Sequence, residues 1–192
     1  MAILYVLICS QNLDGTNRQI LAKSYEELVH PIISQDGRYL AYTEGNQESS
    51  ETDVIIRDIV LKTEHRVNNN KQYAAIPMFN HKGTMLASPI WNRNKVTPAN
   101  IAIYSIERNC IIKAIPSKVE CWRPIFTNDD KKILYIQKEK YFKIKSFDLT
   151  TGAISEILSL PFVYGILQYL LQGVTSYLQE IKMVIGICSP IA

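Results

Sequence analysis

The chain has 192 residues, the length of one ordinary domain, with 47% hydrophobic and 20% charged residues, so general disorder is excluded. Its net charge of +3, from 21 basic and 18 acidic side chains, is too small and too evenly spread for a nucleic-acid-binding protein. Four cysteines exclude a disulfide-dense scaffold.

The amino-terminal segment, residues 1–9, reads MAILYVLIC and has no positively charged region before its apolar residues. Because Ile, Leu, Tyr and Val favour extended structure, we expect a strand over 3–8 rather than a signal peptide. A turn over 13–17 and a return strand over 18–21 complete a hairpin, which is half of a four-stranded unit. No run reaches the roughly 18 apolar residues of a transmembrane helix.

A repeat of about 46 residues follows this hairpin. Pro31, Pro77 and Pro124 are spaced 46 and 47 residues apart, and each begins an apolar run, a polar turn and a second apolar run, over 31–42, 77–88 and 124–135. Such a pattern predicts a β-hairpin. The turns carry residues that accept left-handed backbone geometry, namely Asp36-Gly37, Lys82-Gly83 and Asp129-Asp130.

A second predicted hairpin follows each first one, over residues 53–67, 100–112 and 141–157. Two hairpins make a four-stranded antiparallel unit, and such a unit recurring every 40 to 50 residues is typical of a propeller blade. The sequence therefore predicts an all-β, partial β-propeller, with about three and a half blades in residues 1–159.

The segment 31–42 resembles the Pro-x-x-Ser-Pro-Asp-Gly repeat of TolB-type propellers, with Gln35 in place of the second proline. Residues 13–21 look like the outer hairpin of that family. The resemblance implies either a TolB-like, non-enzymatic binding component of the Tol-Pal envelope system or the propeller that gates prolyl-oligopeptidase-like serine peptidases. The chain lacks the α/β domain that precedes the TolB propeller and has too few blades for a closed six-bladed ring, so it looks like an isolated or truncated piece.

The repeat stops at the carboxyl-terminal tail, residues 160–192. Apolar residues recur there at helical spacing, at Val163, Leu167, Leu170, Val174, Tyr177, Ile181 and Val184, and predict an amphipathic helix. Packing of this helix over an open propeller edge is the preferred interpretation. A degraded blade made of strands and a helix lying on a membrane surface are the alternatives.

Motifs for catalysis are absent from the sequence, which has no G-x-S-x-G, H-E-x-x-H, P-loop or G-x-G-x-x-G pattern. The three histidines are scattered over the predicted blades, so we expect no enzyme activity, no metal and no cofactor. Carboxylates cluster in residues 44–53, where a solvated loop is favoured over a cation site. The cysteines form no C-x-x-C pair, so buried free thiols are expected, although Cys110 and Cys121 could meet across neighbouring strands.

Four aromatic and basic residues are the best functional signal. Trp91 and Arg93 are predicted on the loop between the second and third strands of their blade, and Trp122 and Arg123 just before the next inner strand. Loops of these two types emerge on the same face of a propeller, and Trp and Arg are enriched in binding hot spots. Packing between blades is the alternative role for the two tryptophans.

The predicted function is therefore protein binding, as a TolB-like envelope or scaffold component, and the TolB resemblance implies an envelope lipoprotein as the partner. An inactive fragment of a peptidase propeller and a decayed gene product are the alternatives. A TolB-like role implies the periplasm, although residues 1–9 form no clear signal peptide; otherwise the location is cytoplasmic. A partial propeller also leaves apolar sheet faces uncovered, so we expect self-association.

Overall fold

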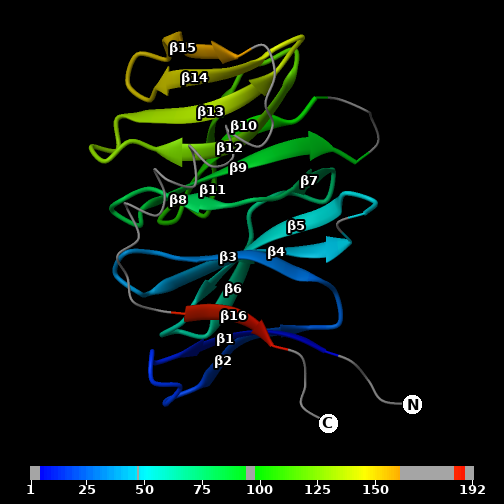
Figure 1. The fold of residues 1–192 in the computed structure, drawn as a ribbon, viewed down its shortest axis with the longest axis vertical. Helices are drawn as coiled ribbons and strands as arrows, with labels where there is room; N and C mark the ends of the chain where they lie inside the picture. The colour runs from blue at the N-terminus through cyan, green and yellow to red at the C-terminus, as the bar shows by residue number, and fades with distance from the viewer. Residues whose placement is uncertain (1–4, 47, 94–97, 161–183, 189–192) are drawn as a thin grey trace.

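The computed structural model describes residues 5–46, 48–93, 98–160 and 184–188 (Figure 1). Throughout these ranges the regular elements are β-strands, and no helix occurs among them. The strands form four separate antiparallel sheets. The predicted all-β class is confirmed.

The first sheet joins the two ends of the chain. It has the strand order β16-β1-β2, with β1 at Val6–Gln11, β2 at Gln19–Ser24 and β16 at Val184–Cys188. Strand β16 pairs along the free edge of β1 and supplies the backbone partners that an edge strand otherwise lacks. Val184–Cys188, in the tail predicted to be helical, form a strand instead, and three of its residues, Val184, Ile185 and Ile187, are β-branched and favour extended structure. The rest of the predicted helix lies outside the described residues.

Three blades follow, each with a full set of antiparallel strands in sequence order from the inside outwards. Blade 1 contains β3 to β6, blade 2 contains β7 to β11, with its innermost strand split into β7 and β8, and blade 3 contains β12 to β15. The bounds are β3 Leu28–Ile33, β4 Tyr39–Asn46, β5 Glu51–Asp58, β6 Thr63–Arg66, β7 Gln72–Ala74, β8 Met78–Phe79, β9 Met85–Asn92, β10 Asn100–Ser105, β11 Cys110–Ile115, β12 Glu120–Phe126, β13 Lys132–Lys138, β14 Phe142–Asp148 and β15 Ile154–Leu160.

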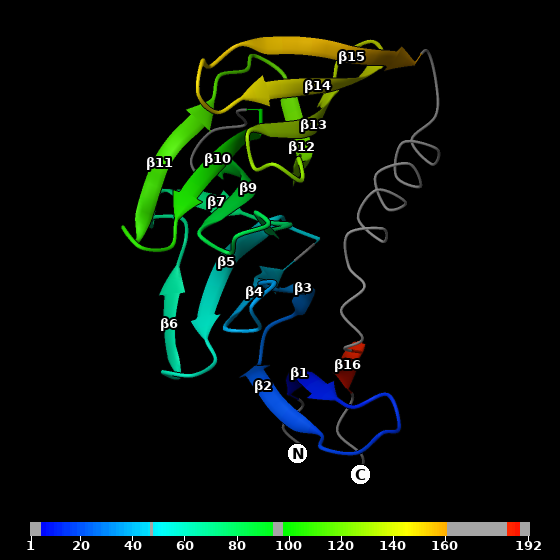
Figure 2. The same ribbon diagram turned by 90° about the vertical axis from the view of Figure 1, so that its left-hand side faces the viewer.

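The four sheets are stacked one after another. The first sheet and blade 3 lie at opposite ends of the stack, and the innermost strands β3 and β12 lie on the side away from the outer strands β6 and β11 (Figures 1 and 2). The described sheets therefore form an open arc of a propeller rather than a closed ring.

Apolar clusters fill each of the three spaces between sheets. Ile8 and Leu40 lie between the first sheet and blade 1. Ile56 and Leu86 lie between blades 1 and 2, and Ile103 lies in the cluster between blades 2 and 3. All are buried. At roughly 25 cal/mol for each square ångström of apolar surface, this burial is the main term that holds the arc together.

The three predicted inner turns have the same geometry. Gly37, Gly83 and Asp130 have φ of 74°, 67° and 56°, and each backbone N–H donates to the carbonyl three residues earlier, on Ser34, Asn80 and Thr127. The side chains of those three residues also accept the N–H of the residue that opens the next strand. Asp130 therefore takes the left-handed place of a glycine, as the sequence predicts.

Another repeated backbone feature precedes each repeat proline. His30, Ile76 and Arg123 all have φ close to 51°, although only glycine adopts this region freely. In blades 1 and 3 the pairing register shifts at these residues, and in blade 2 Ile76 separates β7 from β8. The missing N–H of a proline makes an interruption of the ladder tolerable at this position.

Asp130 also ties two blades together. Its carboxylate accepts hydrogen bonds from the backbone N–H of His81 at 2.7 Å and of Lys82 at 3.1 Å, and from Asn80 Nδ2 at 3.0 Å. The same position in blade 2 is Gly83, where an added Cβ would lie 3.3 Å from the Cβ of Ser34 in blade 1. Each turn therefore rests on the turn of the preceding blade.

Replacement of Asp130 separates these two roles. Asp130→Gly keeps a residue suited to positive φ but removes the three hydrogen bonds, so we expect a loss of about 1–2 kcal/mol in the free energy of unfolding, after relief of the strained backbone. Chemical denaturation measures the change. Asn128→Gly on the same exposed turn is the control and should cost less than about 0.5 kcal/mol. An Asp130→Gly chain as stable as the wild type would contradict the inter-blade role.

Candidate protein-binding site

Three aromatic rings meet at the junction of blades 2 and 3, on the inner strands of these two blades. Trp91, near the end of β9, lies with its ring centroid 5.7 Å from that of Trp122 on β12 and 6.2 Å from that of Tyr73 on β7. The ring planes are tilted by 56° and 45°, within the range of favourable aromatic pairs. All three residues are half-buried, so the aromatic cluster, Tyr73, Trp91 and Trp122, keeps part of its surface in solvent.

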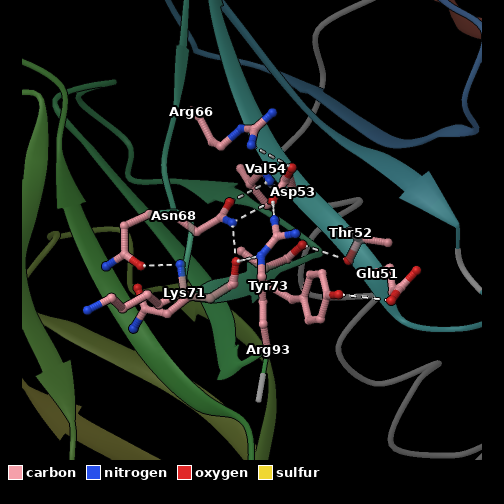
Figure 3. A network of polar contacts seen from close by, with 12 residues as sticks. Glu51, Thr52, Asp53, Val54, Arg66, Asn68, Lys71, Tyr73 and Arg93 are labelled. Atoms are coloured by element: carbon pink, nitrogen blue, oxygen red, sulfur yellow. Dashed lines mark hydrogen bonds and ion pairs between the residues drawn. The ribbon is translucent and has the colours of Figure 1, made fainter. Parts of the chain in front are cut away.

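An ion-pair network lies beside this cluster, between blades 1 and 2 (Figure 3). The carboxylate of Asp53 on β5 accepts from Arg93 Nη2 at 2.6 Å, from Asn68 Nδ2 at 2.6 Å and from Arg66 Nη1 at 3.1 Å. Asn68 is buried, and its side chain also accepts the N–H of Val54 and donates to the carbonyl of Gln72. These four residues form the Asp53 network.

Arg93 joins the two groups. Its Nη2 reaches Asp53, its Nε donates to the carbonyl of Gln72 at 2.9 Å, and its Cζ lies 4.1 Å from the centre of the Tyr73 ring. The Tyr73 hydroxyl in turn lies 3.0 Å from Glu51 Oε1. Arg93 therefore orients an aromatic ring of the cluster while its own charge is paired inside the protein.

Arg123 lies on β12 directly after Trp122. Burial lowers the pKa of His30 on β3, and the positive charge of Arg123 lowers it further. Both residues occupy the left-handed position before a repeat proline. Basic side chains of blades 1 and 3 thus influence each other along the innermost strands.

The sequence and the structure agree only in part on these four residues. Trp91 and Trp122 come together, but both lie on strands rather than on loops, because β9 extends to Asn92 and β12 begins at Glu120. Arg93 does lie just after a strand, and Arg123 lies within β12 rather than before it. Their binding role stays a prediction.

Sequence reasoning missed Tyr73 and Asp53 as partners of this site. No local pattern links Asp53 to Arg93, which lies 40 residues away. The one usable signal is the position of Asp53 at the start of a predicted outer hairpin, directly before an apolar run, Val54-Ile55-Ile56, that must be buried. Asp53 is also one of the carboxylates considered for a cation site in residues 44–53. Arg66 and Arg93 already pair with this carboxylate and would compete with a bound cation.

Other chemistry can be assessed across the described ranges. No group of three His, Cys, Asp or Glu side chains is placed there to hold a metal. Nor does that part of the chain contain a helix with the length and apolar character to cross a bilayer. Cys9 and Cys121 are buried as expected, whereas Cys110 is exposed, so the expectation of burial is wrong for that residue.

Solved structures similar to this fold are β-propellers. The propeller domain of the Trilobed protease from Pyrococcus furiosus matches with a TM-score of 0.58 and 15% identity, over 82% of this chain and 54% of that one. A puromycin-hydrolyzing peptidase of Mycobacterium tuberculosis matches with a TM-score of 0.63 and 16% identity, over 78% and 25%. A protein assigned as TolB from Agrobacterium tumefaciens matches with a TM-score of 0.50 and 10% identity, over 83% and 90%.

These similarities establish the fold class, a β-propeller built from four-stranded blades. The chain spans about half the length of the Trilobed protease propeller and about a quarter of the peptidase. No protein-family model matches the sequence, and a search of curated proteins found no match. The expected resemblance to TolB-type propellers is thus supported at the level of the fold.

The Asp53 network predicts a measurable stability effect. Asp53→Ala leaves two guanidinium groups and a buried amide without their acceptor, and we expect a loss of about 2 kcal/mol in the free energy of unfolding, since the network is partly open to water. Asp53→Asn, which keeps the shape, should cost less. Urea unfolding monitors both, with Glu48→Ala, an exposed carboxylate nearby, as a control below about 0.5 kcal/mol. Equal effects of Asp53→Ala and Glu48→Ala would contradict the network.

Proposed function

We propose that this chain is a non-enzymatic, protein-binding β-propeller that engages its partner through the aromatic cluster and its basic neighbours. The observation that carries the proposal is the Trp91–Trp122 pair, two large rings held 5.7 Å apart and left half-exposed at a blade junction. Rigid aromatic side chains lose little conformational entropy on binding and dominate hot spots.

The surroundings of the cluster support a peptide or protein ligand. Arg93 fixes the Tyr73 ring, so the cluster is organised before any partner arrives. Arg123, on the same strand as Trp122, adds positive charge to the innermost strand of blade 3, which suits a ligand carrying acidic groups or a carboxyl terminus. The TolB resemblance alone adds two further parts to this proposal, a periplasmic location and an envelope lipoprotein as the partner.

Binding can be tested without a known partner. Peptides selected from a random phage library on the immobilised wild-type chain serve as the probe. We expect Trp91→Ala and Trp122→Ala each to weaken the selected peptides by about 1–2 kcal/mol, roughly 5- to 30-fold in dissociation constant. Isothermal titration calorimetry measures the change. Leu61→Ala, at an exposed apolar residue on the turn between β5 and β6, is the matched control and should bind as the wild type.

The proposal would be refuted if the selected peptides bound the Trp91→Ala/Trp122→Ala double variant as tightly as the wild type. Circular dichroism of each variant confirms that its fold is retained.

A second candidate function has support from the structural neighbours, several of which are peptidases carrying such a propeller. Under this alternative the chain corresponds to the propeller part of a serine peptidase and gates a catalytic domain. The sequence has no G-x-S-x-G motif, so it indicates no nucleophilic serine of that class for the hydrolysis itself.

Both candidates predict that the chain alone has no peptidase or esterase activity. Peptide p-nitroanilide and p-nitrophenyl ester substrates should turn over at the background rate, as measured by absorbance with a heat-denatured sample as control. Turnover that a single serine or histidine substitution abolishes would refute the non-enzymatic assignment.

A further inference from the structure

A pocket of about 170 Å³ opens between blades 1 and 2, on the side of the arc where the outer strands β6 and β11 lie (Figure 2). It lies at the start of β4 and at the ends of β5 and β10. The aromatic cluster lies instead near the end of β9, which is the blade 2 counterpart of β4. The pocket and the cluster are therefore on opposite faces of the arc.

Strand register explains which side chains line the pocket. Tyr39, Asp58 and Thr63 are neighbours across β4, β5 and β6, and Ile56 and His65 form the next row, two residues further along. Residues two apart on a strand share a face, so all five face blade 2, as the packing of Ile56 in the core cluster between these blades shows. The row at the pocket carries a carboxylate and a hydroxyl, so the apolar core does not continue to the rim.

The equivalent space between blades 2 and 3 is occupied. Lys113 on β11 is the register counterpart of His65 on β6, because each pairs with an isoleucine of the third strand, Ile103 or Ile56, that lies opposite an alanine of the second. The Lys113 Nζ reaches across to the carbonyl of Leu149 in blade 3 at 2.7 Å. The imidazole of His65 is shorter than this lysine side chain, and a pocket remains at its place.

One wall of the pocket is an ion pair with unused donors. Asp58 is 4% exposed; its Oδ1 accepts the N–H groups of Val60 and Leu61, and its Oδ2 accepts from Arg38 Nε and Nη2, both at 2.9 Å. The acceptor sites and the charge of this carboxylate are thus taken. Arg38 also lies 4.9 Å from the centre of the Tyr39 ring. Two of its five N–H groups bind Asp58, and no described residue accepts from the others.

The facing wall adds another donor. The Tyr104 hydroxyl, which is buried, donates to Asn109 Oδ1, and Asn109 Nδ2 lies 3.5 Å from His65 Nδ1. Because an amide nitrogen can only donate, Nδ1 of His65 accepts here and the ring proton lies on Nε2. Nε2 therefore remains a donor on the rim of the pocket, as does the hydroxyl of Thr63.

We propose that this pocket binds a small aromatic carboxylate, a single ring that bears an acid group. A cavity of about 150 Å³ holds one benzene ring, so the volume suits a ligand of this size. Ile56, Tyr39 and Tyr104 provide an apolar and aromatic lining for the ring. The carboxylate accepts charge-assisted hydrogen bonds from Arg38 and a further one from His65. A cationic ligand is disfavoured, because the lining carboxylate is already paired.

A titration of the full-length, ¹⁵N-labelled chain with sodium benzoate, followed by NMR at constant ionic strength, tests the proposal. We expect saturable shifts of the backbone amides of Thr63, His65 and Asn109, with a dissociation constant of about 0.1–1 mM, which is ordinary for so small a ligand. Benzamide has the same shape without the charge. It should bind at least about 10-fold more weakly, because it loses the charge-assisted bonds.

Two variants assign the acid group to its partners. Arg38→Gln removes the charge and should weaken benzoate about 10-fold or more while changing benzamide less than about 2-fold. His65→Ala should weaken benzoate about 3- to 10-fold. His81→Ala, the same substitution at an exposed histidine on the inner turn of blade 2, is the matched control and should bind as the wild type. Arg38 and His65 are exposed too, so the fold should persist, as checked by circular dichroism.

Three results would overturn the inference. Benzoate shifts that do not saturate, or that lie away from these residues, exclude the pocket as the site. Equal affinity for benzamide and benzoate, or an Arg38→Gln chain that binds benzoate as the wild type, excludes recognition of the acid group. Tighter binding of N-acetyl-phenylalanine amide than of benzoate shows that the pocket takes an apolar side chain of a polypeptide instead. Because the aromatic cluster lies on the other face, the two proposals fail independently.

Discussion

The architecture depends on a constraint that every blade shares, namely that both faces of its sheet are apolar and need a neighbour. Consecutive residues of the second strand show this. Leu40 packs towards the first sheet while Ala41 packs towards blade 2, and Leu86 and Ala87 repeat the arrangement one blade later. A large residue on one face meets a small one from the neighbouring blade, which allows close packing of successive sheets. Because no single blade can bury both faces, the blades must form an arc or a ring.

This packing also stabilises unusual backbone on the inner side of the arc. Ile76 is β-branched and has positive φ, a combination that costs about 1–3 kcal/mol on its own. Its N–H donates to Thr43 Oγ1 at 3.0 Å, and Thr43 is buried in the preceding blade. The strained position is thus held by a neighbouring blade rather than by its own sheet. The equivalent residues His30 and Arg123 turn the innermost strands in the same way.

The repeat was visible in the sequence because its signals are local. Proline spacing, Asp-Gly turns and alternating apolar runs each concern a few neighbouring residues, so the blades and even the left-handed Asp130 could be predicted. Contacts between distant segments could not. The pairing of Arg93 with Asp53 requires knowledge of how blades 1 and 2 stack, and the pairing of β16 with β1 requires knowledge of where the two ends of the chain meet. The helical spacing ends at Val184, where β16 begins, and no local pattern in the sequence indicates that this segment pairs with the edge of β1.

The same distinction applies to the candidate site. Two tryptophans could be placed on one side of adjacent blades from the sequence, but the role of Arg93 depends on the stack. Its guanidinium is paired with Asp53 and lies over Tyr73, so it contributes by fixing a ring more than by offering a free charge. Under the proposed function, a partner would contact three aromatic rings that are already ordered, so these rings would lose little conformational entropy on binding. Under the proposed function, blade packing and binding are linked through this arginine: the contact that joins blades 1 and 2 also organises the cluster at the junction of blades 2 and 3.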